Sequence, residues 1–168
     1  MGNQSLKNLA EAFAGESQAN RRYIAFAKKA EEDGYPNIAR LFRVAAESET
    51  KHAINHLKAM DGIKSTLENA KEAWQGEKDE YTDMYPMFMD QAKRDQNNSA
   101  LKSFFWANEA EKIHGEYYEK AVKALEAGGD MELGDVYVCE VCGMTVEGPP
   151  PEKCPTCGQG KENFSLIE

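Results

Sequence analysis

Apolar residues recur every three or four positions through most of residues 1–127, a spacing that places them on one face of an α-helix. Glycine and proline are sparse there, and the turn sequences Asp33-Gly34-Tyr35-Pro36 and Asp61-Gly62 interrupt the pattern. The pattern predicts four helices, at about 4–32, 36–60, 65–95 and 99–127. Because each helix has one apolar face, we expect them to pack together as a four-helix bundle.

The ends of these helices carry local signals. Ser65, followed three residues later by Glu68, predicts a capping box at the start of the third helix. Ser99 is the candidate N-cap of the fourth helix, and a Gly-Gly pair follows its end. Pro86 predicts a kink within the third helix.

The composition changes near residues 128–135. Glycine and proline become frequent, and all four cysteines of the chain lie in this last part. We therefore predict two domains, a helical one over 1–130 and a small turn-rich one over 135–168.

A glutamate occupies the fourth place of every apolar helix face, near the middle of each helix. An unpaired buried carboxylate costs several kcal/mol or takes up a proton. Four at matching depth, on faces without lysine or arginine, predict a shared metal partner; the alternative is that they face inward by accident. The four residues are Glu16, Glu49, Glu77 and Glu111.

Histidine follows two of these glutamates at a spacing of three, in Glu49-x-x-His52 and Glu111-x-x-His114, so both side chains leave one helix face. The third helix adds Glu80 instead. Such repeats are typical of bundles that hold two metal ions, and oxygen and nitrogen ligands favour iron or manganese. The predicted ligands are Glu16, Glu49, His52, Glu77, Glu80, Glu111 and His114.

Two more polar side chains share these faces. His56 lies one turn beyond His52, where we expect a packing or supporting role rather than metal ligation. Tyr23 is either a buried aromatic residue or a donor to a metal ligand or bound peroxide, and the sequence leaves both open.

The cysteines form two Cys-x-x-Cys-Gly motifs, at Cys139 and Cys142 and at Cys154 and Cys157. Each motif aims two thiolates at one ion, so together they predict a tetrahedral site for zinc or a single iron. The spacing leaves a structural zinc ribbon open. A redox centre in the bundle favours iron, because zinc carries no electron.

The formal net charge is −9, which argues against nucleic-acid binding. No apolar run approaches the roughly 18 residues that a membrane span needs, and the N-terminus has no apolar signal-peptide stretch. We expect a cytoplasmic protein.

The sequence resembles the rubrerythrin family over essentially its whole length. The resemblance implies an all-α ferritin-like four-helix bundle with a di-iron centre, followed by a rubredoxin-like domain with one iron bound by four cysteines. The motifs that carry it are Gly15-Glu16-Ser17-Gln18-Ala19, Arg22-Tyr23, Glu49-x-x-His52-Ala53, Gly76-Glu77-x-x-Glu80, Met84-Tyr85-Pro86, Glu111-x-x-His114 and the two cysteine motifs.

The resemblance further implies a non-haem peroxidase that reduces hydrogen peroxide to water and defends against oxidative stress. Electrons would pass from the rubredoxin-type iron to the di-iron site, and a rubredoxin or an NAD(P)H-linked reductase would replace them. Glu49 and Glu111 would bridge the irons and Glu16 and Glu80 would bind terminally. Two ligands, Glu77 and His52, would exchange at one iron.

From the residues alone, a ferroxidase or a redox sensor remain alternatives to this enzyme. The link between the second and third predicted helices also raises a problem, because about five residues reach at most roughly 17 Å. Helices parallel to each other with Glu49 and Glu77 level would need a span of about 34 Å. We therefore expect either an up-down-up-down bundle or, preferably, a homodimer that exchanges helix halves.

Overall fold

The structure, a computed structural model, describes residues 4–167. They form two compact units, one up to Lys64 and the other from Ser65 onward. The elements are α1 (Gln4–Glu32), α2 (Pro36–Ala59), α3 (Thr66–Asp79), the π-helical η1 (Glu80–Met84), α4 (Tyr85–Arg94), α5 (Asn98–Glu126), β1 (Val136–Cys139), β2 (Thr145–Glu147), the 3-10 helix η2 (Lys161–Asn163) and β3 (Phe164–Ile167).

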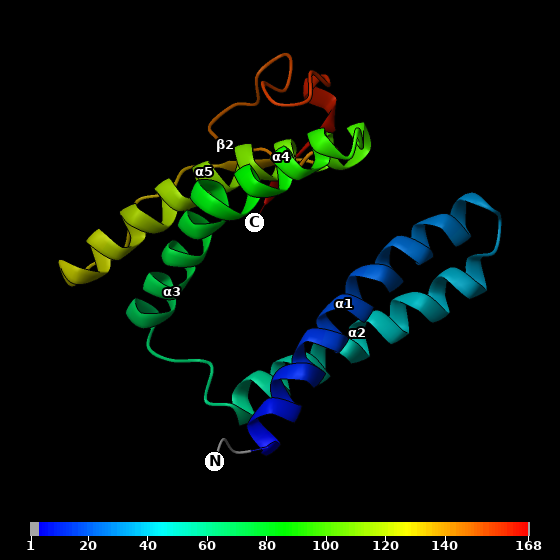
Figure 1. Cartoon of the computed structure of the whole chain (residues 1–168), viewed down its shortest axis with the longest axis horizontal. Helices are drawn as coiled ribbons and strands as arrows, with labels where there is room; N and C mark the ends of the chain where they lie inside the picture. Colours follow the sequence, from blue (N-terminus) through cyan, green and yellow to red (C-terminus); the bar gives the residue numbers. More distant parts are fainter. Residues whose placement is uncertain (1–3, 168) are drawn as a thin grey trace. The chain divides into compact units, whose positions relative to one another are not determined.

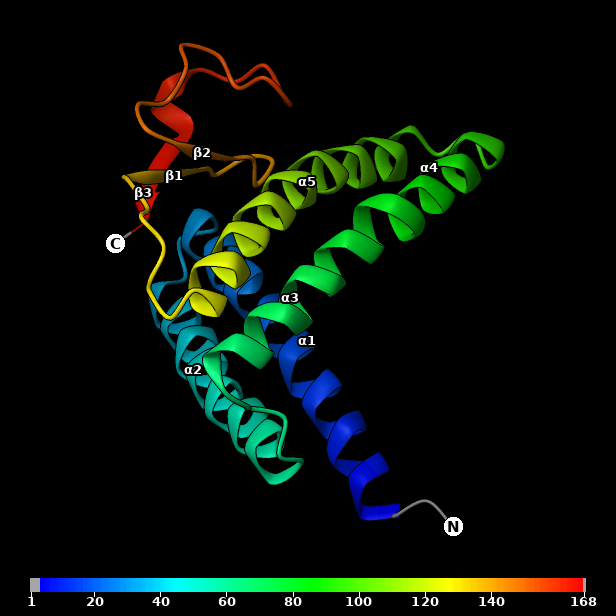
Figure 2. The same ribbon diagram turned by 90° about the vertical axis from the view of Figure 1, so that its left-hand side faces the viewer.

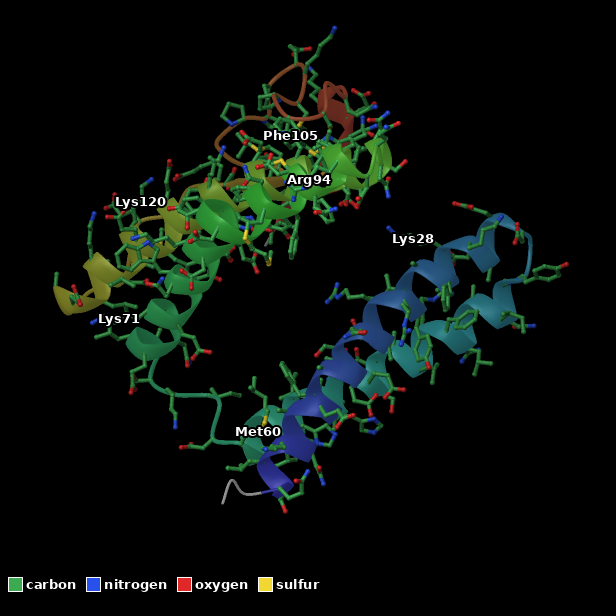
Figure 3. The ribbon with its side chains drawn as sticks, viewed as in Figure 1. Lys28, Met60, Lys71, Arg94, Phe105 and Lys120 are labelled. Carbon is green, nitrogen blue, oxygen red and sulfur yellow. The ribbon has the colours of Figure 1, made fainter. Side chains whose placement is uncertain are left out.

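In the first unit, α1 and α2 form an antiparallel hairpin (Figure 1). Small side chains let the two helices approach closely, and the alanines buried between them are Ala27, Ala30, Ala39, Ala46 and Ala53. The buried Asn20 amide crosses the hairpin and donates to the Ala46 carbonyl at 2.7 Å. Gly34, at φ 81°, makes the turn between the helices, and Met60 marks the end of α2 (Figure 3).

In the second unit, α3, η1 and α4 follow one another without a break and pack along α5. The kink predicted at Pro86 takes a different form, because the irregular stretch is the π-helical η1 just before it. There the Tyr85 N–H donates to the carbonyl of Glu80, five residues back. Pro86 has no N–H for the carbonyl four residues earlier, so regular α-helical bonding is interrupted in any case.

The predicted helix caps are partly confirmed. Ser65 Oγ accepts the Glu68 N–H, and the Glu68 carboxylate accepts the Ser65 N–H, which is the expected capping box. The prediction of Ser99 as a cap is wrong. The N-cap of α5 is Asn97, whose Oδ1 accepts the Ala100 N–H at 3.0 Å, and asparagine serves this position as well as serine does.

Residues 135–167, the cysteine module, contain a three-stranded antiparallel sheet in the order β2-β1-β3 (Figure 2). Its strand β2 contacts α5, which attaches the module to the helical part of the second unit. Of the helices described, none combines the length and apolar character needed to cross a bilayer.

We expect Ser65→Ala to lower the free energy of unfolding by about 1 kcal/mol, because the Glu68 N–H loses its side-chain acceptor. Urea denaturation followed by helical circular dichroism measures this. Ser103→Ala, an exposed position within α5, is the control and should be neutral or slightly stabilising. Equal effects at both positions would contradict the capping assignment.

Candidate metal centres

The first unit brings together Glu16 from α1 with Glu49 and His52 from α2. Their ligand atoms all lie within 4.8 Å of one another, and we call this group the N-terminal triad. His52 Nδ1 lies 2.8 Å from the Glu49 carboxylate, as expected for two residues one helical turn apart. Glu49 is well covered, whereas the His52 side chain is 52% exposed.

The second unit repeats this arrangement with Glu77 from α3 and with Glu111 and His114 from α5. These ligand atoms also lie within 4.8 Å of one another and form the C-terminal triad. His114 Nδ1 lies 2.6 Å from Glu111 and 3.9 Å from Glu77. Each unit therefore contributes one isolated glutamate and one Glu-x-x-His pair, on two antiparallel helices.

The charges of the C-terminal triad show why a cation fits it. Burial, together with the neighbouring Glu111, raises the pKa of Glu77 to about 7. The hydrogen bond with His114 lowers the pKa of Glu111, and the same bond raises the pKa of His114. Carboxylates held this closely repel each other, and a bound metal ion would remove the repulsion.

Glu80 stands at the first position of η1, outside the C-terminal triad but close to it. Burial raises its pKa, and the charge of Glu111 raises it further, so its carboxylate faces the same cluster. π-Helical segments are frequent at functional sites, and here the wider turn falls at a predicted ligand.

The other predicted site residues lie in packed surroundings. The Tyr23 ring packs against Phe26 and Phe42 with centroid distances of 6.4 and 6.1 Å, and the role of its hydroxyl stays a prediction. His56 is partly buried on α2 and is not among the residues of either triad.

Tyr85 belongs to the site surroundings, although the sequence singled it out only as part of a motif. Burial raises its pKa, and the charges of Glu80, Glu111 and Glu77 raise it further. Its place five residues after Glu80, across the π-helical turn, depends on a backbone irregularity that periodicity does not reveal.

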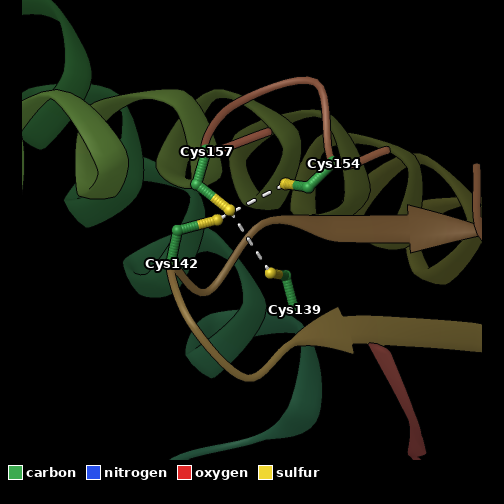
Figure 4. Close-up of side chains that lie close together, drawn as sticks. All are labelled: Cys139, Cys142, Cys154 and Cys157. Carbon is green, nitrogen blue, oxygen red and sulfur yellow. Dashed lines mark hydrogen bonds between the residues drawn. The ribbon is translucent and has the colours of Figure 1, made fainter. Parts of the chain in front are cut away.

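The four cysteines of the module surround one point (Figure 4). The Sγ atoms of Cys139 and Cys157 are 3.7 Å apart, and those of Cys142 and Cys154 are 3.6 Å apart. A tetrahedral site with metal–sulfur bonds of about 2.3 Å has edges of about 3.8 Å, so the four thiols fit such an ion. Burial raises the pKa of the Cys142 thiol, as expected where a metal must compensate the thiolate charge.

Each of the two cysteine motifs forms a backbone turn, and the two turns are of the same type. The Gly143 N–H donates to the Cys139 carbonyl at 2.8 Å, and the Gly158 N–H donates to the Cys154 carbonyl at 2.9 Å. Both glycines have positive φ, 81° and 77°, a conformation that other residues adopt only with strain. This explains why glycine follows each Cys-x-x-Cys.

Comparison with known families agrees with both metal-binding parts. The family model described as Rubrerythrin matches residues 7–122, and the one described as Rubrerythrin, rubredoxin-like domain matches residues 137–165. The chain belongs to the rubrerythrin family. This confirms the predicted fold class, a ferritin-like helical domain followed by a small rubredoxin-like domain. The limits predicted for the two domains, 1–130 and 135–168, stay a prediction.

Similar proteins match along nearly the whole chain. Rubrerythrin-2 of Clostridium acetobutylicum is 36% identical, over 95% of this chain and 94% of its own. Nigerythrin of Nitratidesulfovibrio vulgaris is 34% identical, over 96% of this chain and 85% of its own. A solved structure of nigerythrin in a mixed-valence state covers 99% of this chain and 88% of its own at 34% identity and a TM-score of 0.54.

As a rubrerythrin, the chain has a di-iron site and a rubredoxin-like site with four cysteines. The donor atoms suit both, because carboxylates and imidazoles are ligands of non-haem iron and four thiolates are ligands of a single iron. Which carboxylates and histidines hold each of the two irons stays a prediction.

We expect Glu49→Ala and Glu111→Ala each to reduce bundle iron well below about two ions per chain, because each removes a carboxylate from a triad. The cysteine module should keep its own iron, so metal analysis combined with its visible spectrum separates the two sites. Glu47→Ala, an exposed glutamate on the same helix as Glu49, is the control. Normal loading in both triad variants would refute the assignment.

We expect Cys142→Ser to abolish the red colour of the oxidised protein, because thiolate-to-iron charge transfer needs the complete four-sulfur site. The bundle should keep its iron and, once chemically reduced, still react a single time with peroxide. Absorption spectroscopy and stopped-flow mixing measure these, with Val141→Ala, an exposed neighbour, as control. A colourless native protein with one zinc per chain, prepared in iron-rich medium, would favour a structural role.

Proposed function

We propose that this rubrerythrin is a peroxidase that reduces hydrogen peroxide to water and protects the cell against oxidative stress. The supporting observation is that one chain combines two triads of the Glu and Glu-x-x-His type with a cluster of four thiols. When bound, the iron pair supplies the two electrons of the reaction, in which hydrogen peroxide and two protons give two molecules of water. The four cysteines of the module would hold the iron through which these electrons are replaced.

We assign the ligand roles from the rubrerythrin resemblance and from the positions of these residues in the chain. Glu49 and Glu111 pair with histidines one turn away and would bridge the two irons, with Glu16 and Glu80 as terminal ligands. His114 would stay bound throughout.

A change of ligand would accompany the change of iron oxidation state. Glu77 and His52 would alternate on one iron, the carboxylate being favoured by the more highly charged ferric ion. Tyr23 would lie near the bound peroxide, although its observed ring contacts are also those of a core aromatic residue.

The proposed electron donor is a rubredoxin or an NAD(P)H-linked reductase in the cytoplasm. The cysteine module would receive these electrons. We propose no contact with nucleic acid or membrane, in keeping with the net charge of −9.

Rapid mixing of the fully reduced protein with hydrogen peroxide or with dioxygen tests the proposed peroxidase activity. We expect peroxide to reoxidise the bundle iron at least about tenfold faster than dioxygen at equal concentration, with stopped-flow absorption as the measurement. A ferroxidase would instead prefer dioxygen and deposit added iron as mineral, and a sensor would not turn over with a reductase. Either result would overturn the proposed activity.

We also propose that the di-iron sites form in a homodimer, with α1 and α2 of one chain completing the site of the other. The link from Met60 to Ser65 is too short to place Glu49 and Glu77 level on parallel helices of one chain. Each unit carries its own triad, so halves can be exchanged without loss of a ligand. Leu41 and Val44 on α2 are each 61% exposed, which is the kind of surface that a second helical pair would cover.

Complementation between two inactive variants tests this dimer. We expect a heterodimer of Glu49→Ala and Glu111→Ala, isolated by two different affinity tags, to regain one intact site with about two bundle irons. In an exchanged dimer both substitutions fall in one site and the other site is native. If sites form within single chains, each site carries one substitution and none is restored. A fully iron-loaded monomer in solution would also refute the exchange.

A further inference from the structure

His114 is a predicted iron ligand, and its second ring nitrogen, Nε2, already has a hydrogen-bond partner. His114 Nδ1 faces Glu111 and Glu77, and its other ring nitrogen, Nε2, lies 2.9 Å from the hydroxyl of Thr145. Thr145 is the first residue of β2, in the cysteine module, so the contact joins α5 to that module. The two residues are 31 positions apart in the sequence.

Thr145 is held firmly in place. It is buried, with 6% of its surface exposed, and it pairs with Val138 across the sheet. Its hydroxyl also lies 3.4 Å from the Gly143 carbonyl, to which it donates a hydrogen bond. Gly143 directly follows the cysteine Cys142, so the hydroxyl is positioned by the same turn that positions the thiols.

The two hydrogen bonds of the Thr145 hydroxyl favour one state of the imidazole when a metal is bound. A hydroxyl has one proton, and if Thr145 gives it to the Gly143 carbonyl, its oxygen lone pairs can only accept from His114. His114 then carries a proton on Nε2. Its Nδ1 donates to the Glu111 carboxylate at 2.6 Å, and a metal ion would take the place of that Nδ1 proton. Metal-binding histidines usually donate the second ring N–H in this way, which fixes both tautomer and ring orientation.

We propose that Thr145 is the positioning residue of the di-iron site, fixing the tautomer and orientation of His114 from the cysteine module. The inference rests on the proposed ligand role of His114 and adds a residue that belongs to neither metal-binding motif. The Thr145 hydrogen bond also distinguishes His114 from His52, the other predicted histidine ligand. In the part of the chain that the structure describes, His52 bonds only through Nδ1, to Glu49, so its ring has no comparable anchor.

Three variants test the proposal by metal affinity rather than by peroxidase activity. Thr145→Val keeps the shape and removes the hydroxyl, and Thr145→Ser keeps the hydroxyl. Thr156→Val, at a partly buried threonine of the same module, is the matched control. Anaerobic competition between the bundle and the chelator ferrozine for ferrous iron gives the affinity, and the visible spectrum of the four-thiol iron reports whether the module remains folded.

We expect the valine variant to bind bundle iron about 10- to 100-fold more weakly, the usual effect of losing such a supporting hydrogen bond. The serine variant and the Thr156→Val control should stay within about threefold of the unmodified protein. A valine variant with normal affinity and a normal module spectrum would overturn the proposal, and so would a serine variant as weak as valine.

Nuclear magnetic resonance of the histidine ring nitrogens gives a second measurement, with zinc in all sites to avoid paramagnetism. We expect a slowly exchanging proton on Nε2 of His114 in the unmodified protein and fast exchange in the valine variant. A proton on Nδ1 instead would refute the proposal, and this result decides the question even if the valine variant fails to fold. Loss of iron affinity in a protein without peroxidase activity would refute the proposed function while supporting the role of Thr145.

Discussion

Repulsion between carboxylates held close together on helix faces governs the organisation of this protein. Glu77, Glu80 and Glu111 share one cluster, and the pKa of Glu77 is raised to about 7 by burial and by its neighbour. Folding such residues onto the inner faces of helices is unfavourable unless a cation binds them. A bound pair of iron ions would therefore remove a repulsion between these carboxylates.

The helices are built to bring these ligands to matching positions. In the α1–α2 hairpin only alanines and Asn20 are buried, so the backbones approach closely and Glu16 meets the Glu-x-x-His pair of the neighbouring helix. The second unit repeats this scheme with α3 and α5. There the π-helical η1 changes the direction of the side chains after Glu80 and brings Tyr85 near the carboxylates.

The cysteine module follows a different principle, because its core is too small to be stable alone. Two identical glycine turns and a three-stranded sheet position four thiols, and metal binding supplies much of the stability. The hydrogen bond between His114 and Thr145 ties this module to a predicted ligand of the other metal centre. Within the second unit, this residue pair is one of the contacts between α5 and β2, and it links the two predicted metal centres.

The sequence by itself determined the helices, the capping box at Ser65, the two Glu-x-x-His pairs and the four-thiol site, because each depends on residues within one or two turns of each other. It misjudged the cap of α5, where Asn97 competes with Ser99 two positions away, and the form of the irregularity before Pro86. Only the tertiary structure decided that Thr145 meets His114 and that Tyr85 lies beside the carboxylates. Those contacts depend on how a strand packs on a helix and how a π-helical turn rotates the following residues, and neither leaves a periodic signal in the chain.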